Sequence, residues 1–531
     1  MKSRQAGSER VRHDVVVVGA GHNGLVCAAY LARAGLKVLV LEARSSVGGC
    51  ASTVDALDGA RVNICNCDHS LVLATPIAEE LDLARFGLRY LEVDPMQLSV
   101  GWDGEAPWFL FRDPARTLEG LAIVYPNEVE NYRRYLRVAV PAAELILELA
   151  CAPPTPPRVL RRVLDCRGRG VRILLSWSRR TVGSVVGSLF TTEALRSPVV
   201  TTGPAVWGLS PETPGTGLGA LGYAMKHVTG VARPVGGSGN LPVALARCVE
   251  AMGGTIRTGA RVSELLADDD RVRGVTLDGD EVVEASVVVA AADPRTALVR
   301  WLARPPSGAT RLTGRWRSRP AREGYESKVD AIIERRPRFR GLEAALQQRL
   351  GVVEPLVPTA IVSPDLEEIA RAHEAMRRGE VAARPMFYVN VPSVLDESMR
   401  AKGGDVFSLE VLFTPYRLQG GWKKTAEPAR WLDAFSTLVE PGFLEAVRGW
   451  RVMTPPDYEN DFGLEQGLAP AYGGTALSAL VGRDRELTRY ETPVRGLYLT
   501  GAGTFPGAGI WGASGRNAAH VILSRLEQPR R

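Results

Sequence analysis

The sequence predicts an α/β protein of more than one domain. Apolar, β-branched runs at 14–18 and 37–41 flank a helix-forming stretch at 25–34, which is the pattern of a βαβ unit with buried parallel strands. Similar apolar strands recur far along the chain, at 287–292 and 497–500. A chain of 531 residues also exceeds what one hydrophobic core usually holds. We therefore expect one parallel-sheet domain built from separated segments, beside a second domain.

The loop between the first strand and the first helix has the spacing Gly-x-Gly-x-x-Gly. The first glycine allows a tight turn, the second lets the backbone approach a pyrophosphate, and the third lets helix and strand pack closely. The phosphates would then bind free amides at the N-terminus of the helix. The predicted dinucleotide contacts of this loop are Gly19, Ala20, Gly21, His22, Asn23 and Gly24.

Glu42 ends the second strand, eighteen residues after Gly24. Its carboxylate is expected to accept hydrogen bonds from ribose hydroxyls, which favours FAD or NAD over NADP. The next residues include a Gly-Gly turn that can bring backbone against flavin phosphates and the ribityl chain, an extension that nicotinamide-only dehydrogenases do not need. This turn favours FAD. The predicted contacts of the segment are Ala43, Arg44, Gly48, Gly49, Cys50 and Ala51.

A second glycine-rich segment, 501–515, places six glycines between the strand at 497–500 and a helix expected at 512–526. Such a segment offers amides to a pyrophosphate and directs a helix N-terminus at the flavin, where partial positive charge stabilises a reduced, anionic ring. The predicted flavin contacts here are Gly501, Ala502, Gly509, Ile510, Trp511 and Gly512.

The remaining pattern divides the chain into five segments. Helical composition dominates 115–229, and mixed helices and strands fill 303–480. We predict a Rossmann-type FAD-binding domain assembled from separated segments, and an α+β substrate domain of mixed sheet and helices. The first domain would comprise 13–114, 230–302 and 481–531, and the second 115–229 and 303–480. Further elements expected are a helix at 128–150, a helix that follows the stretch 236–241 and runs through 251, and strands at 255–266, 272–277, 386–391 and 406–413.

Composition excludes several classes of protein. The net charge of 65 − 59 = +6 is mild for this length, so we expect no nucleic-acid partner. Seven sparse cysteines, with Cys65 and Cys67 spaced C-x-C, indicate neither a disulfide framework, a redox C-x-x-C pair nor a metal site. The polar start and the lack of a long apolar run favour a cytoplasmic location. The arginine-rich segment 158–180 is either a peripheral contact with an anionic membrane or a solvated helix face.

These motifs resemble the phytoene desaturase-like branch of the flavin amine oxidase superfamily, and are most similar to the subgroup of pyridine nucleotide-disulphide oxidoreductase domain-containing protein 2. The resemblance runs nearly end to end. It implies that Val262 presents its backbone to the adenine. It also implies oxidation of a hydrophobic substrate by hydride removal to FAD. The matching stretches are HDVVVVGAGHNGLVCAAYLARAG (13–35), LEARSSVGGCAS (41–52), SPETPGTGLGAL (210–221), GGSGNLPVALA (236–246), PSVLDESM (392–399) and VRGLYLTGAGTFPGAGIWGASGRNAAHVIL (494–523).

This chain also departs from the subgroup. Phe505 and Trp511 stand where relatives often carry His and a smaller residue, which implies a bulkier, more apolar lining and a changed substrate. No second Gly-x-Gly-x-x-Gly spacing directly follows a predicted strand and opens a helix, as a loop for NAD(P)H would, so we expect oxygen or a quinone as the electron acceptor.

The candidate catalytic residues are Asp68 and His69, because histidine has a suitable pKa for taking a proton. The alternative is a histidine that only hydrogen-bonds the loop. The leading hypothesis is an FAD-dependent dehydrogenase or desaturase of a hydrophobic, natural-product-like substrate. An amine or alcohol oxidase, a redox-neutral isomerase and a flavin-binding scaffold or chaperone stay open, and the oligomeric state is not indicated.

Overall fold

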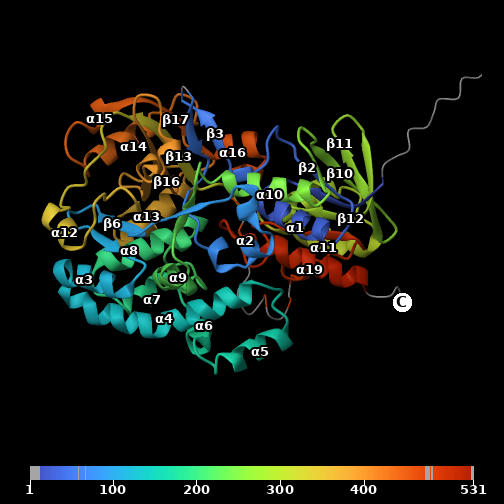
Figure 1. Cartoon of the computed structure of the whole chain (residues 1–531), viewed down its shortest axis with the longest axis horizontal. Coiled ribbons are helices and arrows are strands. Elements are labelled where there is room, and N and C mark those ends of the chain that lie inside the picture. The colour runs from blue at the N-terminus through green and yellow to red at the C-terminus, as the bar shows by residue number, and fades with distance from the viewer. Residues whose placement is uncertain are drawn as a thin grey trace, which may run out of the picture.

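A computed structural model describes residues 12–527 apart from 58, 66, 470, 473–478, 480, 481 and 483. The described part contains two seven-stranded sheets, and each belongs to its own layered unit. The two units lie side by side along the long axis of the molecule (Figure 1). The predicted fold class, a Rossmann-type α/β domain beside a mixed second domain, is confirmed.

The first sheet has a parallel core with the strand order β9-β2-β1-β12-β18. Its strands come from three distant parts of the chain, as the sequence predicts. Their apolar side chains are buried on both faces, because helices and a strand layer cover the sheet. The bounds are β1 (His13–Val18), β2 (Val38–Leu41), β9 (Thr255–Arg257), β12 (Val282–Ala290) and β18 (Leu497–Leu499).

One expectation about this sheet is wrong. The stretch 255–266 is not a single strand, because β9 pairs in parallel with β2 whereas β10 (Val262–Asp268) pairs antiparallel with β11 (Arg271–Leu277). The chain turns between them, where the Gly259 and Ala260 amides donate to the carbonyls of Arg44 and Glu42. These hydrogen bonds fasten the turn beside the end of β2.

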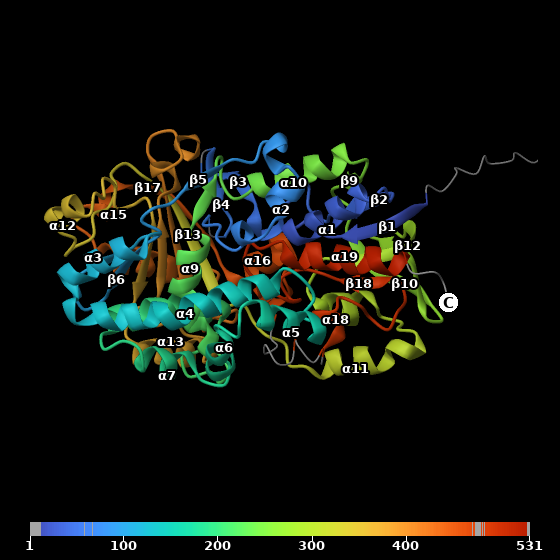
Figure 2. The same cartoon turned by 60° about the horizontal axis from the view of Figure 1, so that its bottom comes forward.

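Three helices cover one face of the first sheet: α1 (His22–Arg33), α10 (Asn240–Ala251) and α19 (Ala513–Glu527). Helix α1 is buried nearly all round, since it lies between the other two (Figure 2). A Cβ atom on Gly515 would overlap the Asn23 carbonyl, so this glycine is needed where α19 crosses α1. The last helix is thereby fixed against the first one.

The second sheet has the strand order β17-β13-β16-β15-β14-β6-β7. Two of its strands, β6 and β7, precede residue 115, so sheet pairing divides the chain earlier than the predicted boundary at 114. Neither strand has a separate signal in the sequence, because both are short. The bounds are β6 (Gln97–Gly101), β7 (Trp108–Leu110), β13 (Glu326–Ile333), β14 (Thr359–Ser363), β15 (Phe387–Asn390), β16 (Asp405–Leu412) and β17 (Val447–Met453).

Helices surround the second sheet. The long α4 (Val129–Ala150) runs along the helical layer below it, as predicted for 128–150 (Figure 2). The arginine-rich segment forms two short helices, α5 (Pro156–Asp165) and α6 (Val171–Trp177). The other helices of this unit are α3 (Pro114–Val124), α7 (Val182–Gly187), α8 (Glu193–Thr202), α9 (Gly222–Thr229), α12 (Ala344–Arg349), α13 (Leu366–Arg377), α14 (Glu427–Ser436), α15 (Phe443–Ala446) and α16 (Pro455–Phe462).

Two small ribbons connect the units. The hairpin of β3 (Thr53–Ala56) and β4 (Ala60–Asn63) follows the Gly-Gly turn, and β5 (Tyr90–Glu92) pairs with β8 (Ala232–Pro234). Three further helices, α2 (Ile77–Glu80), α11 (Thr310–Ser318) and α18 (Arg485–Thr488), lie with the first unit. Within the described ranges, no helix has the length and apolar character needed to cross a membrane.

Candidate functional site

The first glycine loop has the close packing and the open side that its sequence predicts. A Cβ atom on Gly24 would overlap the Gly19 carbonyl oxygen and lie 2.9 Å from the Ala291 Cβ, so α1 packs directly on the end of the sheet. A Cβ atom on Gly21, by contrast, would meet nothing within 4 Å. Backbone amides at the start of α1 can therefore be approached by a phosphate at Gly21.

The Gly-Gly turn lies against this loop. Gly21 and Gly48 pair in an isolated parallel bridge, and the Gly48 amide donates to the Ala20 carbonyl at 2.9 Å. Gly48 has φ +120, a region that side chains disfavour. The loop and the turn thus form one continuous backbone surface, with Cys50 and Ala51 in a short 3₁₀ helix directly after it.

Glu42 is buried at the edge of that surface. Its carboxylate accepts hydrogen bonds from the Ala20 amide at 2.7 Å and the Arg44 amide at 2.9 Å. The predicted contact with a ribose was based on position alone. The carboxylate in addition holds the glycine loop to the segment that begins with Ala43.

The C-terminal loop completes the arrangement. The Ser514 hydroxyl accepts a hydrogen bond from the Gly501 amide at 3.0 Å, which closes the segment over the end of β18. The His22 ring bonds the Gly509 backbone, and burial lowers its pKa to about 4, so the ring is neutral at pH 7. His22 therefore connects the first loop to the last.

Several polar atoms near these loops fit a dinucleotide. Among the described residues, Asn23 Oδ1 and Trp511 Nε1 are buried without a hydrogen-bond partner, although buried polar atoms nearly always have one. Trp511 Nε1 is a donor, Asn23 Oδ1 is an acceptor, and the open side of Gly21 exposes backbone amides, so a dinucleotide would find hydrogen-bond partners of both kinds here. Ala502, Ile510 and Gly512 belong to the same loop, and Val262 begins β10 with its side chain buried in the sheet.

Asp68 and His69 lie between the two sheets. His69 is fully buried, with Nδ1 2.9 Å from the Tyr90 hydroxyl and Nε2 2.8 Å from the Ser238 hydroxyl. Burial, followed by the nearby His22, lowers its pKa to about 3. Both ring nitrogens are thus engaged in hydrogen bonds.

The Asp68 carboxylate accepts hydrogen bonds from Arg233 Nε at 2.7 Å and from the Thr359 hydroxyl. Burial alone would raise its pKa, but the Arg233 charge and these hydrogen bonds lower it below the ordinary value. Asp68 is therefore a paired carboxylate that bridges β8 and β14.

Sequence reasoning missed a polar face on the second sheet. Residues two apart on a strand share a face, and on this sheet one face is apolar while the other carries charge. Lys328 lies opposite Glu410, and Glu326, two residues before Lys328, is on the same face of β13. Lys328 donates to the Asn63 carbonyl at 2.6 Å, which turns this face toward the β3–β4 hairpin. The sequence feature that indicates this polar face is the alternation of charged with uncharged residues in Glu-Ser-Lys-Val-Asp at 326–330.

Glu326 and Glu410 are two carboxyl groups on this polar face, of which Glu410 is buried and Glu326 is half-buried. Burial raises the pKa of Glu410 to about 7, despite the opposing charge of Lys328. Burial, followed by the charges of Glu410 and Cys50, raises the pKa of Glu326 well above its usual range. Since Cys50 follows the Gly-Gly turn, the pair faces the predicted cofactor segment. Shifted carboxyl groups of this kind are typical of functional sites.

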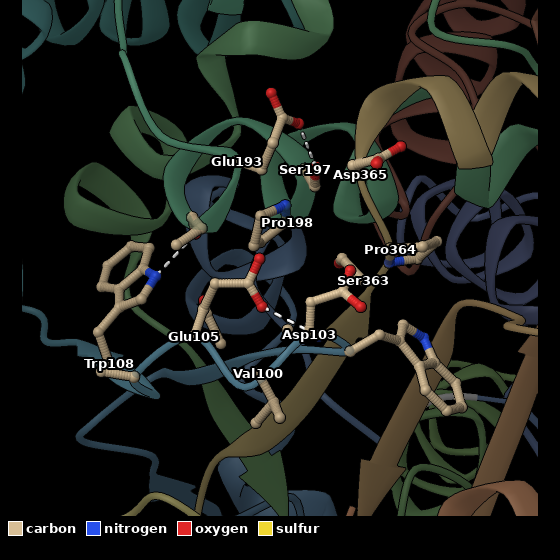
Figure 3. Close-up of a pocket in the computed structure, with 15 residues that line it drawn as sticks. Val100, Asp103, Glu105, Trp108, Glu193, Ser197, Pro198, Ser363, Pro364 and Asp365 are labelled. Atoms are coloured by element: carbon tan, nitrogen blue, oxygen red, sulfur yellow. Dashed lines mark hydrogen bonds between the residues drawn. The ribbon is translucent and has the colours of Figure 1, made fainter.

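A separate pocket lies between the β6–β7 hairpin and α8 (Figure 3). Its volume is about 10 Å³, close to the minimum for a single water molecule. Glu193 is already bonded there to the Ser197 hydroxyl at 3.0 Å. This pocket is too small to hold an organic substrate.

Comparison with known proteins agrees with this geometry. Residues 17–76 match the profile of the NAD(P)-binding Rossmann-like domain, and residues 193–366 match that of flavin containing amine oxidoreductase. The chain is 29% identical to the pyridine nucleotide-disulfide oxidoreductase domain-containing protein 2 of Rattus norvegicus, over 99% of this chain and 96% of the relative.

Two further similarities extend over most of the chain. It is 27% identical to the zeta-carotene-forming phytoene desaturase of Myxococcus xanthus, over 93% of this chain and 90% of the relative. A solved structure of putrescine oxidase bound to putrescine has the same fold, with a TM-score of 0.59 and 17% identity over 97% of this chain and 99% of that one.

Proposed function

The chain belongs to the flavin amine oxidase superfamily and is an FAD-dependent oxidoreductase, and from this premise we propose that it removes hydride from a hydrophobic, natural-product-like substrate to form a double bond. FAD, when bound, supplies the hydride acceptor. The observation that carries the proposal is the convergence of the glycine loop, the Gly-Gly turn and the C-terminal loop beside the second sheet.

In this proposal the chain's own residues bind the FAD and orient it. The amides around Gly21 hold the pyrophosphate, Glu42 accepts from the ribose while it fixes Ala20, and the Val262 backbone faces the adenine. Asp68 and His69 keep the two units in register. The hydrogen bonds on both His69 nitrogens support such a positioning role, and its predicted catalytic role stays a prediction.

A buried apolar cluster beside the C-terminal loop supports a hydrophobic substrate. Leu147 and Ala150 of α4 pack against Trp511 and Ala513, with Met225 at the margin of the cluster. An apolar wall next to the predicted flavin contacts would bind a hydrocarbon skeleton and exclude water from it. Oxygen or a quinone is the acceptor we propose for the reducing equivalents.

A second candidate function rests on the Glu326–Glu410 pair. One buried and one half-buried carboxyl group near Cys50 would accept hydrogen bonds from the N–H or O–H group of a substrate. This observation favours an amine or alcohol oxidase. The two candidate functions share the cofactor site. In the dehydrogenase the apolar cluster at Trp511 would orient the reacting carbon, and in the oxidase the Glu326–Glu410 pair would do so.

Anaerobic addition of candidate substrates to the purified holoprotein distinguishes the functions. Loss of the visible absorption of oxidised flavin with terpenoid or polyene compounds supports the dehydrogenase, and loss with amines or alcohols supports the oxidase. Product that forms only after prior reduction of the flavin indicates a redox-neutral isomerase. A ligand that binds without loss of the flavin absorption and without product formation indicates a flavin-binding scaffold.

We also propose that α5 contacts an anionic membrane. No residue of this helix is buried, and Leu160 and Leu164 are 60% and 68% exposed on a helix rich in arginine. Apolar side chains beside basic ones suit an interfacial helix.

Flotation with phosphatidylserine vesicles tests this contact. We expect salt-sensitive binding that Leu160→Gln with Leu164→Gln weakens and that Val353→Gln, at a valine 97% exposed elsewhere, does not. Equal binding to phosphatidylcholine vesicles, or none to either, would contradict the contact.

A further inference from the structure

Cys50 and Cys65 are fifteen residues apart in sequence but meet at one end of the β3–β4 hairpin. The hairpin pairs Thr53 with Asn63, and the Ile64 amide donates to the Ser52 carbonyl at 3.0 Å. This pairing brings the residue before the hairpin alongside the residue after it. Both cysteines are partly exposed, and neither is in a disulfide.

The two thiols also interact. A hydrogen bond from Cys65 lowers the pKa of Cys50 and, reciprocally, raises that of Cys65 well above its usual value. The charge of Arg44 acts in the same direction on Cys50, against the effect of burial. Burial instead raises the pKa of Cys67 to about 12 and that of Cys248 to about 11. The pair therefore combines one activated thiol with one neighbouring thiol that can resolve a mixed disulfide.

We propose that Cys50 and Cys65 form a reversible dithiol–disulfide site next to the cofactor loop, reacting with low-molecular-weight disulfides. The Cys50 thiolate attacks one sulfur of the small disulfide and releases the other as a thiol. Cys65 then gives up its proton and attacks Cys50 Sγ, which releases the second thiol. The protein loses two electrons and two protons, and the small disulfide gains both to become two thiols.

The site would act on the Gly-Gly turn. Cys50 directly follows Gly49, which lies against Gly21, so a bond to Cys65 ties the turn to the far end of the hairpin. The same bond replaces the thiol pair that faces Glu326 and Glu410. Oxidation thus changes both the cofactor loop and the polar wall opposite it. This inference does not depend on the identity of the substrate.

Differential alkylation of the holoprotein tests the proposal. The protein is equilibrated with mixtures of 2-mercaptoethanol and 2-hydroxyethyl disulfide, quenched with acid and alkylated, and its peptides are identified by mass spectrometry. We expect a Cys50–Cys65 cross-link that rises and falls reversibly with the ratio of disulfide to thiol squared. Full alkylation of both cysteines at every ratio would overturn the proposal, as would a cross-link of Cys65 to Cys67.

Single variants test the order of attack. Cys65→Ser should accumulate one mercaptoethanol adduct on Cys50, whereas Cys50→Ser should leave Cys65 unmodified. Cys166→Ser, at a partly exposed cysteine remote from the hairpin, is the matched control and should retain the cross-link. An adduct on Cys65 in the Cys50→Ser variant, equal to that on Cys50 in its counterpart, would overturn the assigned roles. Because the wild-type measurement needs no substitution, misfolding of a variant leaves the cross-link test intact.

Discussion

The backbone of Gly21 pairs with the backbone of Gly48, so the predicted phosphate loop and a turn twenty-seven residues later form a single surface. Glu42 reinforces that pairing from the side, through the amides of Ala20 and Arg44. We therefore expect binding of the cofactor and the conformation of the turn to be coupled, so that substitutions in either element affect the other.

Gly21→Asp should abolish retention of FAD while leaving the fold intact. The new side chain enters open space, but its carboxylate would lie where the phosphates bind. A like-charge penalty of roughly 1.4 kcal/mol already weakens affinity about tenfold. The ratio of flavin to protein after purification measures the effect, with thermal unfolding of the apoprotein as the check on folding. Gly314→Asp, on the exposed face of α11, is the control, and stoichiometric FAD in the Gly21 variant would contradict the assignment.

Glu42→Gln should weaken FAD binding and lower stability together. The amide is neutral, so both backbone donors, Ala20 and Arg44, lose their charged partner, and the one that faces the new NH₂ group also loses its acceptor. A hydrogen bond to a charged group contributes roughly 1.5–3 kcal/mol. Urea unfolding of the apoprotein and fluorescence titration with FAD measure the two effects. Glu440→Gln at an exposed position should change neither, and a stable variant with unchanged FAD affinity would refute the coupling.

Glu410→Gln should stabilise the protein more at pH 8 than at pH 5. The pKa of Glu410 is about 7 in the folded state, against about 4.3 for an ordinary glutamate. The unfolded chain therefore loses this proton first. The contribution of the Glu410 carboxyl group to the free energy of unfolding is greatest below about pH 4 and decreases as the pH rises to 7. The glutamine cannot ionise and avoids that loss.

The measurement is the free energy of unfolding of wild type and variant at both pH values. Glu79→Gln, at an exposed site, should give the same difference at each pH. An identical effect of the Glu410 substitution at pH 5 and pH 8 would show that its carboxyl group is ionised normally.

The His69 ring should remain neutral from pH 8 to pH 5. Burial lowers its pKa to about 3, and its two hydrogen bonds satisfy the neutral ring. The unfolded chain binds a proton near the ordinary pKa of about 6.5, so this group's contribution to stability is present above that pH and is lost as the pH falls toward 3. Nitrogen-15 NMR of the imidazole, assigned with His69→Gln, reads the protonation directly. A titration midpoint near 6.5 would contradict the buried geometry.

The cofactor side of the molecule could be predicted from the sequence, whereas only two strands of the second sheet, those expected at 386–391 and 406–413, could be. Gly19, Gly21 and Gly24 act through backbone geometry that depends on a few neighbouring residues, so their spacing carries the information. Glu326 and Glu410 owe their raised pKa values first to burial, which depends on how distant segments pack over the sheet. The alternation at 326–330 indicates a polar face but does not indicate that the face is covered. Cys50 and Cys65 likewise meet only because the intervening hairpin folds. The break between β9 and β10 depends on hydrogen bonds to the carbonyls of Glu42 and Arg44. The strand propensities of residues 255–266 do not indicate these bonds.

The assembly of the first sheet from distant segments has a consequence for synthesis. Strand β18 completes the sheet beside β12, and α19 covers α1, yet both follow more than two hundred residues after β12. While the ribosome translates the intervening stretch, the nascent chain presents an unpaired β12 edge and an uncovered α1. Exposed strand edges and apolar surface promote aggregation. Protection by a chaperone during this interval would therefore govern the yield of folded protein.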